Sequence, residues 1–203
     1  MASKRLSEPV EIGRRIVVWG VTGSGKTIVA RRLGEALGLP VLELDSLFWR
    51  PVWQRTPPGE FRLEVAQKLV ADGAWISDGD YFPELGALAL TLADTVVWVR
   101  LPWYVSFWRL LKRTVQRAWR RQEPWADGGE AWRSPLLSKD TIRWVRASIW
   151  IVWWSIWHHT AHARDVHRLL MSATQNAVIL ELRSQREVEA FLRAVEQVRS
   201  APP

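Results

Sequence analysis

The chain has no cysteine among its 203 residues. It therefore cannot form a disulfide, use a thiolate as a nucleophile or bind a metal through sulfur. It also has no uncharged apolar stretch that reaches the ~18 residues needed to span a bilayer. The first residues, MASKRLSEPVEIG, are polar and lack the apolar core of a secretory signal. We expect residues 1–13 to form a disordered lead-in and the protein to be cytoplasmic.

Two residue types are unusually frequent. The chain has 15 tryptophans, and its formal net charge of +7 comes mainly from arginine, since only 5 of its 28 lysine and arginine residues are lysine. Arginine is suited to two-point recognition of phosphate and carboxylate groups. We therefore expect an anionic partner, whether a nucleotide, a phosphorylated metabolite, a nucleic acid or an acidic lipid. The alternative is a basic surface that only solvates the protein.

Short apolar runs alternate with amphipathic segments, a pattern typical of an α/β fold with a parallel sheet. We predict five strands and three main helices. The strands are expected at 15–20, 39–44, 74–77, 94–102 and 176–183, and the helices at 27–38, 56–73 and 184–198. Thr56 and Pro57 are the expected start of the second helix, and Ser184 and Glu187 are spaced as a capping box.

A basic, tryptophan-rich helical insertion is expected at 103–171, between the last two strands. A stretch with proline, glycine and charged residues at 120–135 predicts a loop within it. The length suits one domain, so we expect 14–200 to form a single domain with this helical insertion.

The stretch GVTGSGKT at 20–27 matches the phosphate-binding pattern G-x-x-x-x-G-K-[ST] and stands between a predicted strand and a predicted helix. Its glycines let backbone N–H groups turn inward around phosphates, and the helix N-terminus adds a positive dipole end. The residues expected to bind the nucleotide are Gly20, Gly23, Ser24, Gly25, Lys26 and Thr27. Lys26 is expected to reach the β- and γ-phosphates of ATP, and the Thr27 hydroxyl to coordinate Mg²⁺. The alternative is a glycine-rich turn with an unrelated lysine.

Two aspartates end predicted strands. Ligands of an open α/β sheet bind outside the carboxyl ends of its strands, so Asp45 and Asp78 should face the phosphate-binding loop. Phosphoryl transfer needs one carboxylate near the metal and one that orients or deprotonates the acceptor. We assign Asp78 to Mg²⁺ and Asp45 to the acceptor, as a base or as an orienting group. The alternative for each is a turn residue.

Five neighbours of these aspartates are candidates for the acceptor site. Asp80 and Tyr81 would supply a polar and a stacking group beside the pocket, and Phe48, Trp49 and Arg50 would line it. Phe48 and Trp49 can equally belong to the core.

Several stretches together resemble one family: GVTGSGKT at 20–27, ELDSLFWRPVW at 43–53, AWISDGDY at 74–81, DTVVWVRLP at 94–102 and LRSQREVEAFL at 182–192. They are similar to the bacterial adenylate-kinase-like P-loop proteins catalogued as DNA topology modulation proteins. The resemblance implies a sheet of order 2-3-1-4-5, a mobile basic lid, ATP with Mg²⁺, and a small-molecule or nucleotide acceptor.

The stretch SDGDYFP is also similar to the Asp-Gly-Phe-Pro-Arg segment of adenylate kinases, which implies that Asp78 lies near the metal. The chain departs from these patterns at three positions. No arginine follows Pro83, Asp80 stands where the family commonly has asparagine, and Arg100 stands where an acidic residue is common. These departures leave the identity of the acceptor open.

Arginines recur every fourth residue in the segment 103–122, which predicts one basic helix face. They are Arg109, Arg113, Arg117 and Arg121. A lid arginine can neutralise charge on a transferring phosphoryl group, and we favour Arg113 and Arg117 for that role. The alternative is a solvated basic face.

The segment 144–157 is apolar nearly all the way round a helix. Core packing, an aromatic acceptor pocket, a homodimer surface and membrane contact all suit it. His158 and His162, in the histidine group that follows, have a spacing that binds zinc only with a third ligand. Positive side chains at a helix C-terminus are the simpler explanation of that group.

Together these patterns predict a kinase that uses ATP and Mg²⁺ to phosphorylate a small molecule or nucleotide through a hydroxyl or phosphate group. Two alternatives stay open. A nucleic-acid-associated ATPase would use the arginines along a phosphate backbone. A regulatory module would bind ATP without turnover.

Overall fold

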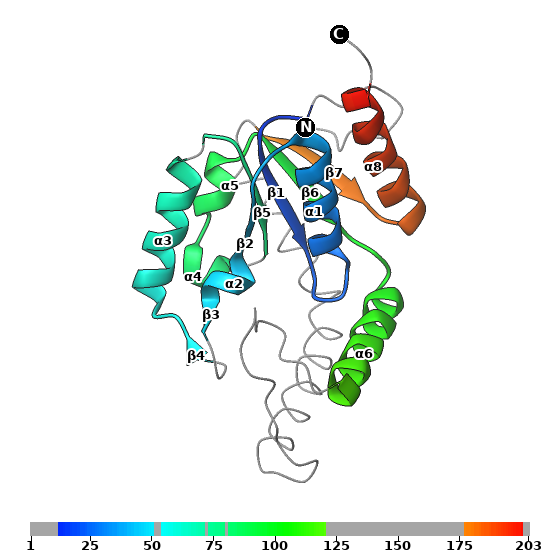
Figure 1. Cartoon of the computed structure of the whole chain (residues 1–203), viewed down its shortest axis with the longest axis horizontal. Coiled ribbons are helices and arrows are strands. Elements are labelled where there is room, and N and C mark those ends of the chain that lie inside the picture. Colours follow the sequence, from blue (N-terminus) through cyan, green and yellow to red (C-terminus); the bar gives the residue numbers. More distant parts are fainter. Residues whose placement is uncertain (1–11, 51–53, 72, 80, 121–176, 201–203) are drawn as a thin grey trace.

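The computed structural model describes residues 12–50, 54–71, 73–79, 81–120 and 177–200. Within them, five strands form one parallel sheet in the order β2-β5-β1-β6-β7 (Figure 1). The strands are β1 (Arg15–Gly20), β2 (Val41–Glu43), β5 (Trp75–Asp78), β6 (Thr95–Val99) and β7 (Val178–Leu182). The predicted α/β class with a five-stranded parallel sheet is confirmed.

Two short strands that the sequence did not predict, β3 (Trp49–Arg50) and β4 (Gln54–Arg55), pair antiparallel outside this sheet. Because β3 and β4 are counted in the labels, the order β2-β5-β1-β6-β7 looks different from the predicted order 2-3-1-4-5. When only the five strands of the sheet are numbered along the chain, their order is 2-3-1-4-5. The strand predicted at 39–44 is also shorter than expected, because the helix α2 already begins at Leu44.

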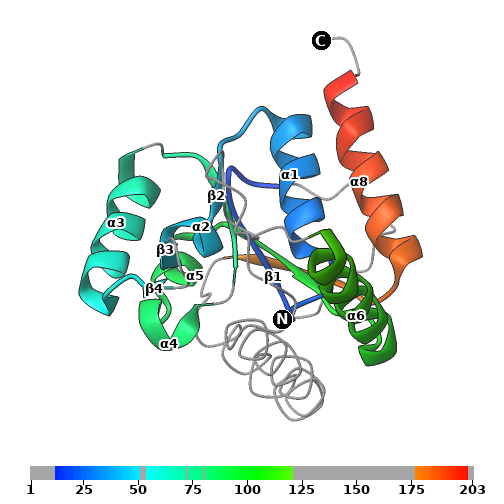
Figure 2. The ribbon, with the colours of Figure 1, turned by 60° about the horizontal axis from the view of Figure 1, so that its bottom comes forward.

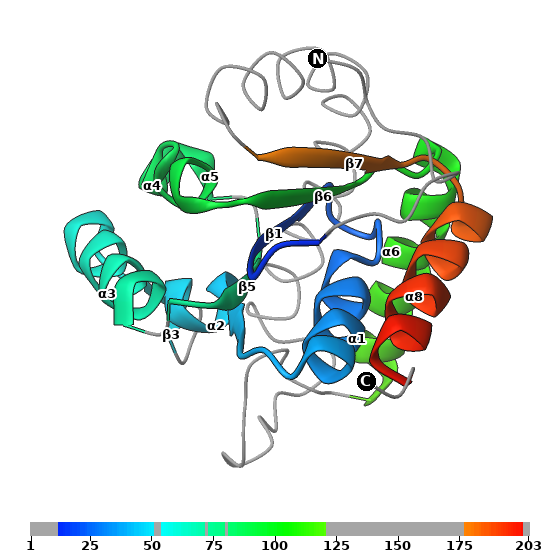
Figure 3. The ribbon, with the colours of Figure 1, turned by 90° about the horizontal axis from the view of Figure 1, so that it is seen from above.

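Helices lie on both sides of the sheet. Their bounds are α1 (Lys26–Leu37), α2 (Leu44–Phe48), α3 (Pro58–Ala71), α4 (Phe82–Leu85), α5 (Leu88–Leu92), α6 (Trp103–Arg120) and α8 (Gln185–Ser200). The helices α1 and α8 lie side by side on one side of the sheet, and α3, α4 and α5 lie on the other (Figure 3). This is the layered arrangement typical of a parallel sheet covered on both faces.

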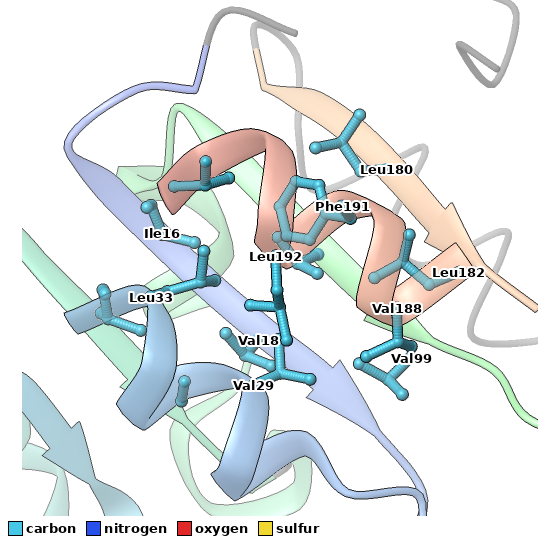
Figure 4. Packing of buried hydrophobic residues seen from close by; sticks show 14 of the residues in the cluster. Ile16, Val18, Val29, Leu33, Val99, Leu180, Leu182, Val188, Phe191 and Leu192 are labelled. Atoms are coloured by element: carbon cyan, nitrogen blue, oxygen red, sulfur yellow. The ribbon is translucent and has the colours of Figure 1, made fainter. Parts of the chain in front are cut away.

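Alternation along β1 divides the interior into two hydrophobic clusters, because neighbouring strand residues point to opposite faces. Ile16 and Val18 pack with α1 and α8, where Phe191 is fully buried (Figure 4). Val17 and Trp19 pack on the other face, among residues of α3, α4 and α5. Apolar surface removed from water contributes about 25 cal/mol per Å², so these two clusters fix the sheet between its helical layers.

The start of α3 differs from the prediction. The helix begins at Pro58, and Thr56 does not serve as its cap. Thr56 is 2% exposed, its hydroxyl donates to the Leu47 carbonyl at 2.7 Å, and its N–H donates to the Phe48 carbonyl at 2.9 Å. The side chain therefore ties the end of β4 to α2, a tertiary contact that takes the place of capping.

The capping box predicted for the last helix is present in a shifted form. The Ser184 hydroxyl accepts the N–H of Glu187 at 3.2 Å, as expected for a residue just before α8. The Glu187 carboxylate reaches back one residue further than in the usual box and accepts the N–H of Arg183 at 2.7 Å.

The helix α6 lies at the edge of the sheet where the strands have their carboxyl ends, beside the start of α1 (Figure 2). Its backbone approaches the loop after β1 closely, since a Cβ added to Gly23 would lie 2.4 Å from the carbonyl oxygen of Ser106. No helix in the described ranges is both long enough and apolar enough to cross a membrane. The loop expected at 120–135 beyond Arg120, the tryptophan-rich segment 144–157 and the four histidines lie outside those ranges.

Candidate functional site

The six residues predicted to bind phosphate lie at the end of β1, in the loop from β1 to α1 and at the start of α1. Gly23 and Gly25 have left-handed φ values of 84° and 94°, which glycine adopts without strain. A Cβ on Gly20 would lie 2.7 Å from the Val99 carbonyl oxygen, so the loop excludes side chains here as well. Gly25 caps α1 without a side-chain hydrogen bond, so N–H groups at this helix end remain for an anion.

Asp78 is the last residue of β5 and lies beside this loop. In the sheet it is in register with Val18 of β1 on one side and Glu43 of β2 on the other. Val18 lies two residues before Gly20, where β1 ends and the loop follows. Asp78 is 5% exposed, and its Oδ1 has no hydrogen-bond partner within the described part of the chain. Burial raises the pKa of Asp78, and the Lys26 charge and a hydrogen bond with Thr27 oppose that rise. The sheet therefore brings a buried carboxylate to the two residues predicted to meet phosphate and metal.

These groups fit a magnesium ion held mainly by its substrate. Mg²⁺ is usually bound through one or two carboxylates, waters and substrate phosphates. The unpaired Oδ1 of Asp78 and the hydroxyl of Thr27 are oxygen donors of that kind. Among the described residues, no group of three or more His, Cys, Asp or Glu side chains could hold a metal.

The sequence predicted that Asp45 ends a strand, and this is wrong. β2 ends at Glu43, and Asp45 lies in the first turn of α2. Its Oδ1 accepts a hydrogen bond from the Tyr81 hydroxyl at 2.5 Å. Its negative charge also contributes to the raised pKa of Asp78, so the two carboxylates are close enough to repel each other electrostatically.

The aromatic residues near Asp45 divide between core and surface. Phe48 is 4% exposed and belongs to the core, one of its two predicted possibilities. Its ring centroid lies 4.6 Å from that of Tyr81 and 5.0 Å from that of Trp49. Trp49 is half-buried and has the guanidinium of Arg55 5.6 Å from its ring centroid. Tyr81 thus packs into an aromatic cluster with Phe48, and its role as a stacking group beside the pocket stays a prediction.

The two remaining residues predicted for the acceptor site are Arg50 and Asp80. Arg50 is exposed on β3 and forms an ion pair with Glu60 of α3. Asp80 lies outside the described residues.

Arg109 of α6 contacts the phosphate-binding loop. One guanidinium nitrogen donates to the Ser24 carbonyl at 3.1 Å, and the other donates to Oε1 of Gln185 at 2.7 Å. The favoured Arg113 and Arg117 follow on the same helix, and their side chains are not among those described. Arg109 is one turn closer to β6 and hence to the loop. That spacing was visible in the sequence, but the contact with Gln185 was not, because Gln185 is 76 residues away.

No family model matches the chain, and no curated protein does. The resemblance to the DNA topology modulation proteins therefore stays a prediction.

Several solved structures are similar to the chain over nearly their whole length. Shikimate kinase from Acinetobacter baumannii, in complex with shikimate, is 17% identical, with 90% of each chain covered and a TM-score of 0.48. Shikimate kinase from Bacteroides thetaiotaomicron is 15% identical, with 92% of this chain and 98% of that chain covered and a TM-score of 0.43. A sugar kinase from Janibacter sp. HTCC2649 is 16% identical, with 92% and 96% covered and a TM-score of 0.45. At this level the likeness concerns the fold alone.

Proposed function

We propose that this chain is an ATP- and Mg²⁺-dependent phosphotransferase that moves the γ-phosphoryl group of ATP to a hydroxyl group of a small acceptor. The observation that carries the proposal is Asp78. The Asp78 carboxylate is buried and one of its oxygens is unpaired, which costs folding free energy in the absence of ligands. A bound cation would pair with that oxygen and offset the cost. The neighbours of Asp78, Lys26 and Thr27, are the charged and hydroxyl-bearing residues of a phosphate-binding loop.

The loop and α1 would hold the phosphates of ATP. Backbone N–H groups of 20–27 and the N-terminal end of α1 would donate to phosphate oxygens, with the Lys26 ammonium offsetting their charge. Asp78 and Thr27 would hold Mg²⁺, which when bound supplies charge neutralisation at the phosphate oxygens. Arg109 would bring a further positive charge next to Ser24.

Asp45 would receive the acceptor. Its carboxylate would accept a hydrogen bond from the acceptor hydroxyl, and it would orient that oxygen or take its proton. The acceptor oxygen then forms a bond to the γ-phosphorus as the bond to the bridging oxygen breaks, and ADP leaves with that electron pair. A carboxylate suits a hydroxyl better than an acceptor phosphate, and the nearby Arg50 is already paired with Glu60.

The test is ADP release from Mg–ATP, alone and with a panel of hexoses, polyols, shikimate, nucleosides, nucleoside monophosphates and short DNA. Lys26→Ala serves as the inactive control. We expect one class of hydroxyl-bearing acceptor to raise ADP release, and the control to abolish the rise.

Other outcomes would point elsewhere. Stimulation by DNA alone would favour the nucleic-acid-associated ATPase and contradict the kinase. ATP binding without ADP release under every condition would favour a regulatory module. Stimulation by nucleoside monophosphates alone would keep the kinase and replace the hydroxyl acceptor with a phosphate.

A further inference from the structure

The hydrogen bond between Tyr81 and Asp45 joins two segments that lie 36 residues apart in the chain. Asp45 stands in the first turn of α2, and Tyr81 immediately precedes α4. The donor and acceptor oxygens are 2.5 Å apart, at the short end of the range for an O–H group that donates to a carboxylate. The contact is therefore a direct tertiary link to the carboxylate proposed to receive the acceptor.

The ring of Tyr81 is fixed by its neighbours. Its centroid lies 4.6 Å from that of Phe48 and 5.3 Å from that of Phe61, and both phenylalanines are buried. A tyrosine side chain has only two rotatable bonds, so packing of the ring also fixes the position of the hydroxyl. Asp45 is itself half-buried on a helix of five residues. The fixed partner in this pair is thus Tyr81.

The backbone at Gly79, shortly before Tyr81, lies close to α2. Gly79 has a φ of 141°, a conformation that favours glycine. A Cβ there would lie 3.0 Å from Cβ of Leu44, the residue before Asp45, and 3.4 Å from Cδ2 of Tyr81. At Gly79, directly after β5 ends at Asp78, the chain therefore lies tightly against α2. This close contact lies in the sequence between the carboxylate proposed for the metal and the tyrosine that holds the carboxylate proposed for the acceptor.

The hydroxyl keeps its proton and so remains a donor. Burial raises the pKa of Tyr81, and the negative charge of Asp45 raises it further. A buried tyrosine hydroxyl needs a hydrogen-bond partner. The competing explanation is therefore that Asp45 only satisfies the Tyr81 hydroxyl, with no effect on the acceptor.

We propose that Tyr81 is a positioning residue: it holds Asp45 through Oδ1, so that Oδ2 receives the hydroxyl of the acceptor. The inference rests on the proposed function. It gives Tyr81, predicted from the sequence as a stacking group beside the pocket, an action through Asp45.

The test compares the kinetics of Tyr81→Phe, Asp45→Asn and the double variant. ADP release from Mg–ATP is measured with water alone and with the acceptor panel, at a temperature where circular dichroism shows every variant folded. Tyr104→Phe is the matched control, because Tyr104 is the only other tyrosine and is 52% exposed on α6. This variant should keep the wild-type rate.

Tyr81→Phe should lower kcat about 10–100-fold, because a displaced catalytic group costs up to about that much. Its KM for ATP should stay within about twofold of the wild-type value, since ATP binding does not involve Asp45. The double variant should be no slower than Asp45→Asn, because both changes act through one carboxylate.

The outcomes separate the inference from the function on which it rests. A wild-type kcat in Tyr81→Phe, or losses that multiply in the double variant, would overturn the positioning role and leave the kinase in place. A wild-type chain that releases no more ADP than Lys26→Ala under any condition would overturn both.

Discussion

At the scale of single residues, the buried Asp78 is proposed to bind the metal but should lower the stability of the ligand-free fold at neutral pH. Burial raises its pKa above the ordinary value of 3.8, so the folded chain releases this proton at a higher pH than the unfolded chain. Below pH 3.8 the carboxyl is protonated in both states and contributes no difference. As the pH rises toward the raised pKa of the folded state, the unfolded chain binds fewer protons than the folded one, and stability falls.

Asp78→Asn removes this loss, so we expect the variant to be more stable than the wild type at pH 7 without ligands. A gain of about 1 kcal/mol would raise the unfolding midpoint by about 2–4 °C in a domain of this size. The gap should close on acidification, and ADP release should be lost. Thermal unfolding of both proteins at pH 4 and pH 7 measures the difference.

Asp94→Asn is the control for this prediction. The Asp94 carboxylate accepts the N–H groups of Arg14 and Arg15 at 3.1 Å, so its neutralisation should lower stability at pH 7. A lower unfolding midpoint for Asp78→Asn as well would contradict the view that Asp78 is held at a cost.

Gly23 combines a left-handed backbone with a close neighbour. We expect Gly23→Ala to lose more than the roughly 1 kcal/mol of left-handed strain, because its Cβ would lie 2.4 Å from the Ser106 carbonyl oxygen. Gly38→Ala is the matched control, with a φ of 65° and nothing within 4 Å of the added Cβ. Chemical denaturation measures both. Equal losses would mean that α6 yields to the added methyl group.

At the scale of elements, α6 connects the phosphate-binding loop to α8 through Arg109. We expect Arg109→Ala to weaken Mg–ATP binding about tenfold, the equivalent of one charge-assisted hydrogen bond. Lys112→Ala removes the same charge from an exposed position on the same helix and should leave the affinity unchanged. Isothermal titration calorimetry measures both. Equal weakening would assign the effect to net charge instead of to the contact with Ser24.

The helix α2 illustrates why the end of a strand can be misplaced from the sequence. The run LPVLEL predicted a strand through Leu44, with Asp45 at its end. The strand stops at Glu43, and the next five residues turn into a helix that buries Leu44 and Phe48. Periodicity does not separate a short buried strand from a buried helical turn, so the packing partners decided the boundary.

At the scale of the whole molecule, nucleotide binding should appear as added stability. A ligand that binds only the folded chain stabilises it by about 2.7 kcal/mol at a concentration of 100 times its Kd. We therefore expect Mg–ATP at saturation to raise the unfolding midpoint by about 5–10 °C. Lys26→Ala should abolish the rise, and Asp78→Asn should remove the part that depends on Mg²⁺. A midpoint that ATP does not move would contradict the site itself.

The sequence by itself determined the parallel sheet and the phosphate-binding loop. Both depend on local features: apolar runs long enough for strands, and glycines with a lysine at a fixed spacing before a helix. Only the tertiary structure decided the partners of Asp45 and Arg109. Tyr81 is 36 residues from Asp45, and Gln185 is 76 residues from Arg109, so no local pattern relates them. These contacts depend on how the fold places α2 beside the start of α4, and α6 beside the start of α8, which is a property of packing.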